Sequence, residues 1–443
     1  MKKVSLVSLG CSKNLVDAEE MLWLLSESGF EIAESEEDAD IMIVNTCAFI
    51  DSAKQESIDC ILEHAKYKEK DKDRILVVTG CMSQRYKEEL QKELPEVDIV
   101  IGTNDYDKIA EILKDYKKGD KKIYCCDEYI TKSIKRAVTT PGYMAYLKIA
   151  EGCDNHCTYC IIPSIRGKYR SRKLEDIVSE AKELVKDGAK ELIVIAQDTT
   201  KYGIDLYGEY MLPKLLEKLC QIDGLHWIRL HYLYPELITD ELIEIVSKSE
   251  KICNYFDIPI QHCNNQILKL MGRKTNKEEI TKLIKKIREK ISDAVIRTTL
   301  IVGFPTETDE QFDELREFVT EMEFDRLGAF AYSQEEGTAA ARLDGQIDEE
   351  EKLNRQEMIM VDQAAVSEEL GRRRTGKTFE TLVEGYDAVI KQYFGRTYAD
   401  SDEIDGKVFF TSKKKLSQGE FVKVKINDYT EYDLYGEAEL EGV

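Results

Sequence analysis

The sequence predicts an α/β protein of three consecutive domains: an N-terminal parallel sheet flanked by helices, a central partial barrel of six strand–helix units, and a small C-terminal antiparallel β-barrel. Three observations predict this fold. β-rich runs alternate with amphipathic stretches at the start of the chain, this alternation restarts near Tyr146, and short alternating strands with turn residues replace it from Thr378. A chain of 443 residues is also too long for one ordinary core. The expected domain limits are 1–120, 139–371 and 372–443.

The N-terminal domain shows the pattern of a parallel sheet between helices. Its predicted strands are Val4–Leu9, Ile41–Val44, Ile75–Val78 and Ile99–Ile101. Amphipathic stretches such as Val16–Ser28 and Ser52–Lys66 predict helices between them. A polar, basic connector at 131–136 then leads to Pro141-Gly142, which together predict a linker.

The central and C-terminal regions differ in the length and spacing of their strands. The central strands are expected at Tyr146–Ile149, Leu192–Ala196, Trp227–Leu230, Tyr255–Ile258, Val295–Leu300 and Leu327–Tyr332. Six units predict a partial (βα)6 barrel, because a closed eight-unit barrel usually needs about 250 residues. A charged helix is predicted at Glu349–Leu370. The C-terminal strands are expected at Phe379–Glu384, Tyr393–Tyr398, Val408–Phe410, Phe421–Ile426 and Tyr435–Leu440.

Composition indicates a globular protein, and the expected compartment keeps its thiols reduced. Hydrophobic residues make up 42% and charged residues 34% of the chain. The apolar run after Met1-Lys2-Lys3 is too short for a signal peptide, and no stretch approaches a membrane-spanning length. We therefore expect a cytoplasmic protein with no membrane partner. In that compartment twelve cysteines indicate metal or cluster ligation more readily than disulfides.

The formal net charge of −23 bears on the choice of partner. An acidic surface repels the phosphate backbone of nucleic acids and attracts basic proteins. Many acidic soluble enzymes have no charged partner at all, so this alternative stays open.

Three closely spaced cysteines, Cys153, Cys157 and Cys160, follow the first strand of the partial barrel. Thiolates are the usual ligands of a [4Fe–4S] cluster, and three of them leave the fourth iron open to an outside ligand. Reductive cleavage of the sulfonium in S-adenosylmethionine requires such an open iron. A zinc loop is the alternative, but it would need a fourth protein ligand, for which the loop offers His156.

Three other cysteines, Cys11, Cys47 and Cys81, lie far apart in sequence, yet each directly follows a predicted parallel strand. The carboxyl ends of parallel strands share one edge of the sheet, so we expect these thiols to converge there. They would form a second three-thiolate cluster site. Each cysteine taken alone could equally be a small buried hydrophobic residue. The remaining cysteines lack such placement and are interpreted as structural: Cys60, Cys125, Cys126, Cys220, Cys253 and Cys263.

At Cys153, Cys157 and Cys160 the chain resembles the radical S-adenosylmethionine superfamily, whose signature is CxxxCxxC. The resemblance implies a 5′-deoxyadenosyl radical that abstracts hydrogen from the substrate. It also implies cofactor contacts at the strand ends, namely Gln197, Asp198 and Thr199 after the second strand, and Gly303, Phe304 and Pro305 after the fifth. Both stretches can also be interpreted as plain turn residues.

The order of the three domains resembles the methylthiotransferase family over nearly the whole chain, with a C-terminal barrel similar to the TRAM module. The segment Ser8–Asp17 resembles the RimO branch, which modifies an aspartate of a ribosomal protein. The MiaB branch, which modifies adenosine in transfer RNA, typically has a Gly-Cys-Gln-Met-Asn type of start there. Cys157–Pro163 followed by Arg166-Gly167 also agrees with the family.

The resemblance implies two [4Fe–4S] clusters, S-adenosylmethionine and an external electron donor. The implied reaction inserts sulfur into an unactivated carbon and methylates it, on an aspartate of a basic small-subunit ribosomal protein, the twelfth. No protein acid or base is evident, so no catalytic side chain is predicted. A non-catalytic, metal-stabilised translation factor is the alternative from another class, but each cysteine set is one ligand short of a closed site.

The charge of the C-terminal barrel is an independent check on the substrate. Residues 375–443 hold nine Lys or Arg against fourteen Asp or Glu. A barrel that binds transfer RNA should be basic, so this charge argues against transfer RNA as the substrate, whereas an acidic barrel suits a Lys- and Arg-rich protein. Lys413-Lys414-Lys415 is a local basic cluster, interpreted as a solvated loop that could also touch ribosomal RNA.

Overall fold

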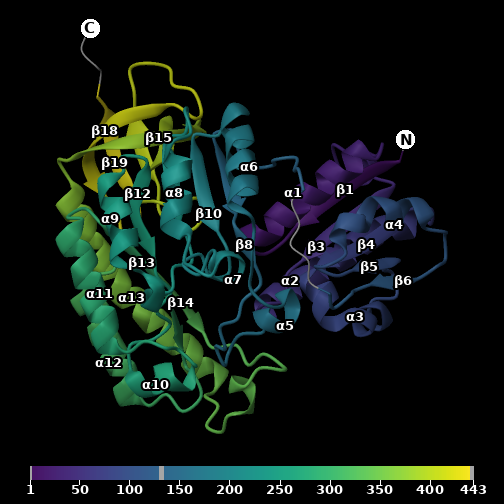
Figure 1. Cartoon of the computed structure of the whole chain (residues 1–443), viewed down its shortest axis with the longest axis horizontal. Coiled ribbons are helices and arrows are strands. Elements are labelled where there is room, and N and C mark those ends of the chain that lie inside the picture. Colours follow the sequence, from purple (N-terminus) through teal and green to yellow (C-terminus); the bar gives the residue numbers. More distant parts are fainter. Residues whose placement is uncertain (1, 129–133, 440–443) are drawn as a thin grey trace.

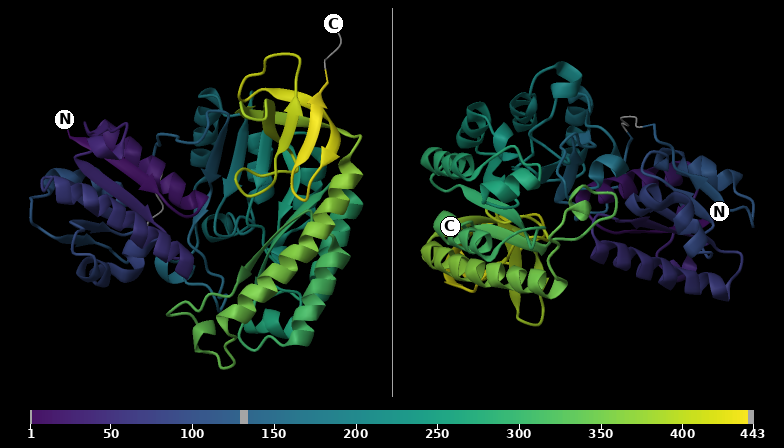
Figure 2. Two further views of the ribbon diagram at one scale, coloured as in Figure 1. Left: turned by 180° about the vertical axis from the view of Figure 1, so that it is seen from behind. Right: turned by 90° about the horizontal axis from the view of Figure 1, so that it is seen from below.

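The computed structural model describes residues 2–128 and 134–439, so the predicted connector at 131–136 lies partly outside the described residues. Figure 1 shows the N-terminal sheet domain beside the central domain, with the C-terminal barrel packed against the central domain. Figure 2 shows the same arrangement from behind and from below. In the described part of the chain, no helix has the length and apolar character needed to cross a membrane.

The N-terminal domain holds a parallel sheet with strand order β2-β1-β3-β4-β5-β6 among the described residues. The strands are β1 (Lys3–Ser8), β2 (Glu31–Ile32), β3 (Ile41–Thr46), β4 (Ile75–Gly80), β5 (Ile99–Ile101) and β6 (Lys122–Tyr124). The helices are α1 (Ser12–Glu27), α2 (Asp51–Lys70), α3 (Cys81–Glu93) and α4 (Ile109–Asp115). The predicted strands are confirmed, whereas β2 and β6 were missed because these short edge strands carry no buried apolar run.

Burial on both faces explains the apolar runs of this sheet. Every residue of β3 and β4 is buried. Side chains of α1 and α4 pack on one face of the sheet, and side chains of α2 and α3 pack on the other. A parallel sheet covered by helices on both sides requires such continuous apolar strands.

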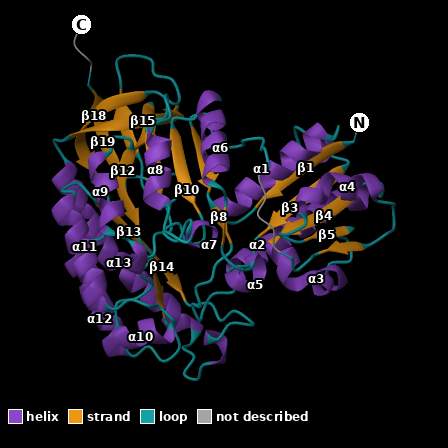
Figure 3. Cartoon of the chain, viewed as in Figure 1, coloured by secondary structure: helices purple, strands orange, loops and turns teal. Residues whose placement is uncertain are grey.

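The central domain is built on a second parallel sheet, with strand order β14-β13-β12-β11-β10-β7 in the described region. The strands are β7 (Met144–Lys148), β10 (Glu191–Ile195), β11 (Trp227–Leu230), β12 (Ile252–Asp257), β13 (Val295–Val302) and β14 (Arg326–Ala331), with a separate small pair β8 (Ala150–Glu151) and β9 (Arg170–Ser171). The predicted six-strand partial barrel is thereby confirmed. Figure 3 shows its orange strands with purple helices along the outside.

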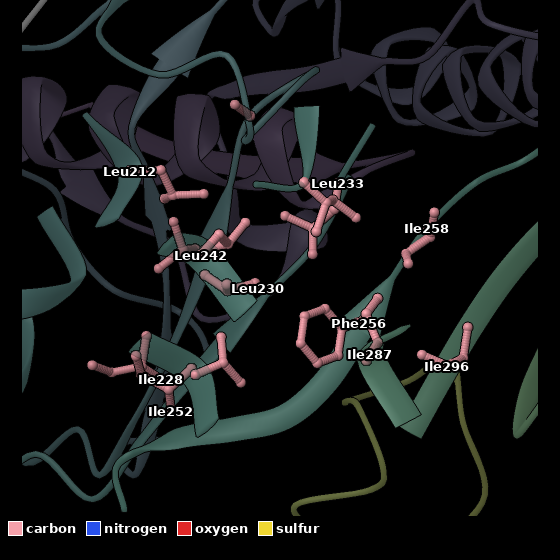
Figure 4. Packing of buried hydrophobic residues seen from close by; sticks show 14 of the residues in the cluster. Leu212, Ile228, Leu230, Leu233, Leu242, Ile252, Phe256, Ile258, Ile287 and Ile296 are labelled. Carbon is pink, nitrogen blue, oxygen red and sulfur yellow. The ribbon is translucent and has the colours of Figure 1, made fainter. Parts of the chain in front are cut away.

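The helices of the central domain lie mostly on the outer face of this sheet, but the first of them, at 162–166, packs against α3 of the N-terminal domain. They are α5 (Ile162–Arg166), α6 (Leu174–Lys186), α7 (Ile204–Tyr207), α8 (Leu212–Cys220), α9 (Asp240–Lys248), α10 (Asn265–Leu270), α11 (Lys277–Lys290), α12 (Asp309–Met322) and α13 (Glu349–Arg374). Short 3-10 helices occur at Glu36–Asp38, Tyr106–Lys108, Pro235–Leu237 and Ala340–Arg342. Figure 4 shows the core between sheet and helices, where Ile228, Leu230 and Phe256 meet Leu242 and Ile287.

The C-terminal domain is a closed barrel with strand order β15-β16-β17-β19-β18 among the described residues. Its strands are β15 (Thr378–Asp387), β16 (Gln392–Thr397), β17 (Val408–Thr411), β18 (Phe421–Tyr429) and β19 (Leu434–Ala438). The expectation of a wholly antiparallel barrel was wrong at one pair, because β17 and β19 run parallel. The chain crosses from β17 to β18 and returns in a hairpin, so β19 closes the barrel in the direction of β17.

The barrel is fixed to the central domain through the segment 398–407 between β16 and β17. Arg229 on β11 donates to the carbonyl of Tyr398 at 2.6 Å, and His231 lies 2.8 Å from the hydroxyl of Ser401. The hydroxyl of Tyr255 donates to Asp405 at 2.6 Å. Leu382 and Ala399 of the C-terminal domain belong to the cluster of buried side chains on the face of the central sheet opposite its helices, and Val16 of α1 joins the same cluster.

Candidate functional site

The N-terminal cysteines meet at the carboxyl edge of the first sheet, because β1, β3 and β4 are adjacent and parallel. Cys11 is exposed, Cys47 is half-buried and Cys81 is buried, and Cys11 lies close enough to raise the pKa of both other thiols when it is a thiolate. A β-carbon on Gly10 would lie 2.7 Å from that of Cys47, and the φ of Gly10 is +86°. Glycine is therefore needed for the loop after β1 to approach Cys47 this closely.

Asn14 joins two of the three cysteine loops. Its side-chain amide donates to the carbonyl of Leu9 at 2.7 Å and to that of Thr46 at 3.2 Å. These carbonyls lie shortly before Cys11 and Cys47. Because Asn14 itself is buried, its amide satisfies backbone groups that water does not reach.

Arg166, at the end of α5 in the central domain, reaches the third cysteine. Its guanidinium lies 3.4 Å from the sulfur of Cys81 and donates to the side-chain oxygen of Asn14 at 2.9 Å. It also donates to Asp17 at 2.5 Å and lies 3.3 Å from Glu151. The central domain thus supplies the side chain that connects the N-terminal cysteine loops.

Burial sets the state of the N-terminal thiols. It raises the pKa of Cys81 to about 12 and also raises the pKa of Cys47. Arg166 opposes the shift of Cys81 without cancelling it. Thiolate, not thiol, is the metal ligand, so an iron–sulfur cluster bound here must displace these protons.

The central cysteines occupy the loop between β8 and α5. Cys153 and Cys157 are buried and Cys160 is half-buried, and both of the former lie close enough to raise the pKa of Cys160 when they are thiolates. The backbone N–H of Asn155 points at the sulfur of Cys153 at 3.4 Å. A β-carbon on Gly152 would lie 2.1 Å from the carbonyl oxygen of Lys168, so only glycine fits before Cys153. Burial raises the pKa of Cys153 to about 11 and that of Cys160 to about 12.

A buried arginine stands beside the central cysteines. Arg273 lies 3.9 Å from the sulfur of Cys157 and donates to the carbonyl of Pro259 at 3.0 Å. Its guanidinium carbon lies 4.4 Å from the ring centroid of Tyr234, whose hydroxyl is 3.9 Å from the same sulfur. This cation would offset part of the negative charge of thiolates in the loop.

The residues of the first predicted cofactor stretch, 197–199, have two different kinds of surroundings. Asp198 is fully buried and accepts hydrogen bonds from Asn155 at 2.9 Å and Thr200 at 2.6 Å, which ties β10 to the cysteine loop. Gln197 and Thr199 differ, because one side-chain oxygen of each is buried and has no hydrogen-bond partner in the described part of the chain. Orphaned buried oxygens fit a site that a polar cofactor completes.

The second predicted cofactor stretch, residues 303–305, makes its contacts with neighbouring residues of the protein. The N–H of Gly303 donates to Glu307 at 3.1 Å, and Phe304 packs edge-on to Tyr332 at 5.3 Å between ring centroids. Pro305 is buried as well. Contacts from this stretch to a cofactor therefore remain a prediction.

Side chains bridge the two cysteine sites. One oxygen of Glu151 accepts from Gln197 at 2.5 Å and the other faces Arg166. Burial alone would raise the pKa of Glu151, but Arg166 and Lys148 outweigh it and hold that pKa at about 2. Glu151 therefore carries a negative charge that links the Arg166 network to the loop of Cys153.

A second bridge crosses between the domains on the β14 side. Glu335, in the loop after β14, pairs with Arg85 at 2.7 Å and with Lys54 at 3.0 Å. Arg85 also donates to the carbonyl of Ala48, the residue after Cys47, at 2.9 Å. The carboxyl edges of the two sheets are thus connected on both sides.

A single metal ion and an iron–sulfur cluster require different spacings of their ligands. Among the described residues, no group of three or more Cys, His, Asp or Glu side chains is close-set enough to hold one metal ion. In a cubane cluster each thiolate binds a different iron atom, so its ligands lie further apart. All twelve cysteines are free thiols.

Sequence comparison identifies the family. The profile of uncharacterized protein family UPF0004 matches residues 3–102, the radical SAM superfamily matches 147–319, and the TRAM domain matches 375–438. The chain is 54% identical over its full length to the full-length ribosomal protein uS12 methylthiotransferase RimO of Clostridioides difficile. The chain belongs to the RimO family of methylthiotransferases. RimO of Caldicellulosiruptor saccharolyticus is 53% identical, over 99% of this chain and all of that protein.

Solved structures support the fold of this RimO family member. The radical S-adenosylmethionine methyltransferase TsrM of Kitasatospora setae aligns with a TM-score of 0.55 at 13% identity, over 74% of this chain and 73% of that one. The cobalamin-dependent radical enzyme OxsB aligns with a TM-score of 0.52 at 15% identity, over 82% and 56%. As a RimO family member, the chain is a radical S-adenosylmethionine methylthiotransferase with an iron–sulfur cluster.

Sequence reasoning missed the side chains around the cysteines. Asn14, Asp17 and Arg166 lie within the segments that resemble the family, but no feature of the neighbouring sequence predicts which residues they contact. No sequence motif pointed to Arg273 or Glu151 as part of the site. The contacts of Arg166 with Cys81, of Glu151 with Gln197 and of Arg273 with Cys157 each join segments more than forty residues apart, so only the assembled RimO fold reveals them.

Proposed function

We propose that this enzyme adds a methylthio group to the β-carbon of an aspartate in ribosomal protein uS12. It would use two [4Fe–4S] clusters, one on Cys11, Cys47 and Cys81 and the other on Cys153, Cys157 and Cys160. The proposal includes a cytoplasmic location, an external electron donor, and no role for transfer RNA as substrate. The domain limits 1–120, 139–371 and 372–443 are part of it.

One observation carries the proposal: two sets of three thiols lie at the carboxyl edges of two sheets, and Arg166 lies between them. Its guanidinium is within hydrogen-bonding distance of Cys81 and 3.3 Å from Glu151, two residues before Cys153. Each set is one thiolate short of four and so leaves an iron open. Two open sites side by side suit a reaction that joins a radical step to sulfur transfer.

When bound, the clusters and S-adenosylmethionine supply the electron, the hydrogen-abstracting radical, the sulfur and the methyl group. The chain's own residues supply orientation. Asn14 and Arg166 fix the three N-terminal loops, and Asp198 fixes the loop of Cys153 through Asn155. The orphaned oxygens of Gln197 and Thr199 offer hydrogen-bond acceptors to the cofactor.

The substrate assignment rests on the relatives and on charge. The aligned relatives are named for uS12, and the C-terminal barrel is acidic, as expected for binding a basic protein. The exposed Glu431 and Glu437 belong to this acidic surface.

The test is anaerobic incubation of the reconstituted enzyme with S-adenosylmethionine, a reductant and purified uS12, followed by peptide mass analysis. The expected result is a methylthio group on one aspartate and about eight iron atoms per chain, as two four-iron clusters require. Transfer RNA is incubated in parallel. Modified transfer RNA together with unmodified uS12 would refute the substrate assignment.

A further inference from the structure

A buried lysine lies between the two cysteine sites. Lys13 belongs to the first turn of α1, two residues after Cys11, and its side chain is 7% exposed. Its ammonium lies 3.5 Å from the ring centroid of Tyr232, which follows β11 of the central domain. The carbonyl of Tyr232 accepts the N–H of Thr199 at 3.0 Å. Lys13 therefore reaches from the N-terminal site to the predicted cofactor contacts.

The ammonium of Lys13 has no carboxylate partner within 4.0 Å in the described part of the chain; Tyr232 is its partner. The neighbouring carboxylates are engaged elsewhere. Asp17 pairs with Lys148 and Arg166, and Glu151 pairs with the same two cations. A charge held in the interior is costly unless an opposite charge joins it.

We propose that Lys13 binds the side-chain carboxylate of the aspartate that is modified, an inference that rests on the function proposed above. The reacting carbon of an aspartate is bonded directly to that carboxylate. An ion pair with Lys13 would therefore fix the β-carbon next to the site of Cys11. The side chain of Lys13 is buried, lacks a carboxylate partner and lies beside the N-terminal cysteines. All three features fit a carboxylate ligand.

Another carboxylate could reach the same place, namely the α-carboxylate of S-adenosylmethionine. The position of Lys13 on the N-terminal domain, in the turn after Cys11, favours the substrate. The two sources predict different losses when the charge is removed, so one set of variants separates them.

The decisive variant is Lys13→Met, which keeps the length of the side chain and removes its charge. Lys13→Arg keeps the charge. Lys70→Met is the matched control, because the exposed Lys70 also lies over an aromatic ring, 5.5 Å from the centroid of Tyr67, on the far side of the N-terminal domain. Iron content and circular dichroism report whether each variant is folded and loaded.

Binding is measured by calorimetry, with a uS12 peptide that contains the aspartate and with S-adenosylmethionine separately. For Lys13→Met we expect peptide affinity to fall about tenfold or more, the usual cost of a charge-assisted hydrogen bond, with affinity for S-adenosylmethionine unchanged. Lys13→Arg should restore part of the peptide affinity, and Lys70→Met should match the wild type.

A peptide with asparagine in place of the aspartate completes a double-mutant cycle. We expect wild type and Lys13→Met to bind this peptide equally weakly. Unchanged affinity of Lys13→Met for the aspartate peptide would overturn the inference, as would a loss confined to S-adenosylmethionine. Failure of the wild-type enzyme to modify uS12 at all would instead refute the proposed function.

Discussion

The two cysteine sites are built in opposite ways. Cys153, Cys157 and Cys160 lie in one loop of the central domain, whereas Cys11, Cys47 and Cys81 follow three different strands at the edge of a sheet. The first set is brought together by local chain geometry. The second exists only when β1, β3 and β4 are paired in order. The N-terminal site therefore depends on the fold of the whole domain and on the contacts that hold its cysteine-bearing segments together.

The supporting contacts differ in the same sense. The central loop is held by the side-chain contact of Asn155 with Asp198 and also by backbone hydrogen bonds, such as Thr158 N–H to Met271 at 2.9 Å and Ala340 N–H to Thr158 at 2.8 Å. The N-terminal loops are held by the side chains of Asn14 and Arg166. Single substitutions outside the cysteines should therefore damage the N-terminal site more readily than the central one.

The largest effect is expected from Cys157→Ala. Losing one of three thiolates should displace the central cluster, so formation of 5′-deoxyadenosine should fall to background. Liquid chromatography of the nucleoside product measures this. Cys220→Ala, on α8 away from both sites, is the control and should keep wild-type cleavage. Normal cleavage by Cys157→Ala would contradict the assignment of the central triad.

Cys47→Ala should separate the two sites functionally. We expect it to cleave S-adenosylmethionine and to form no methylthiolated uS12, since its ligand role belongs to the N-terminal set alone. Iron content should fall by about half, from two four-iron clusters to one. Both products are quantified from the same reaction. A normal yield of modified uS12 without Cys47 would mean that the N-terminal triad is structural.

The same contrast explains what the sequence could predict. The central loop was recognisable from the spacing of three cysteines, and the edge of the first sheet from cysteines that follow apolar runs. The role of Arg166 was not predictable, because it depends on how two domains approach each other. Short edge strands such as β2 and the parallel pairing of β17 with β19 also escaped, since neither leaves a periodic pattern.

Asn14→Ala tests whether a side chain holds the distributed site. It would leave the partly buried carbonyl of Leu9 and the buried carbonyl of Thr46 without this donor, and an unpaired buried group costs about 1–3 kcal/mol. We expect a lower iron content at the N-terminal site and several-fold less methylthiolation, with 5′-deoxyadenosine formation retained. Asn254→Ala is the matched control, because Asn254 makes one exposed hydrogen bond to Asp293. Equal iron content in both variants would show that the N-terminal cluster site does not need the hydrogen bonds of Asn14.

The C-terminal barrel adds a contrast between buried and surface charge. Its buried Arg396 pairs with Glu191 of the central domain at 2.8 Å, and Arg326 of the central domain pairs with Asp400. Deleting the barrel would remove these ion pairs and expose the apolar side chains of the central sheet that pack with Leu382 and Ala399. Surface substitutions are therefore the sharper test of substrate docking.

The smallest effect is expected from the double variant Glu431→Gln/Glu437→Gln, which removes two exposed carboxylates of the barrel. Surface charges mainly steer encounter, and salt screens them beyond a Debye length of about 8 Å at physiological ionic strength. We expect kcat/KM for uS12 to fall a few-fold at low salt, with kcat unchanged. The wild-type value should fall with added salt, and that of the variant should fall less steeply. Glu63→Gln/Glu69→Gln, on α2 of the N-terminal domain, is the matched control of equal charge. If this control lowers kcat/KM as much as the barrel variant, docking depends on total charge and not on the barrel.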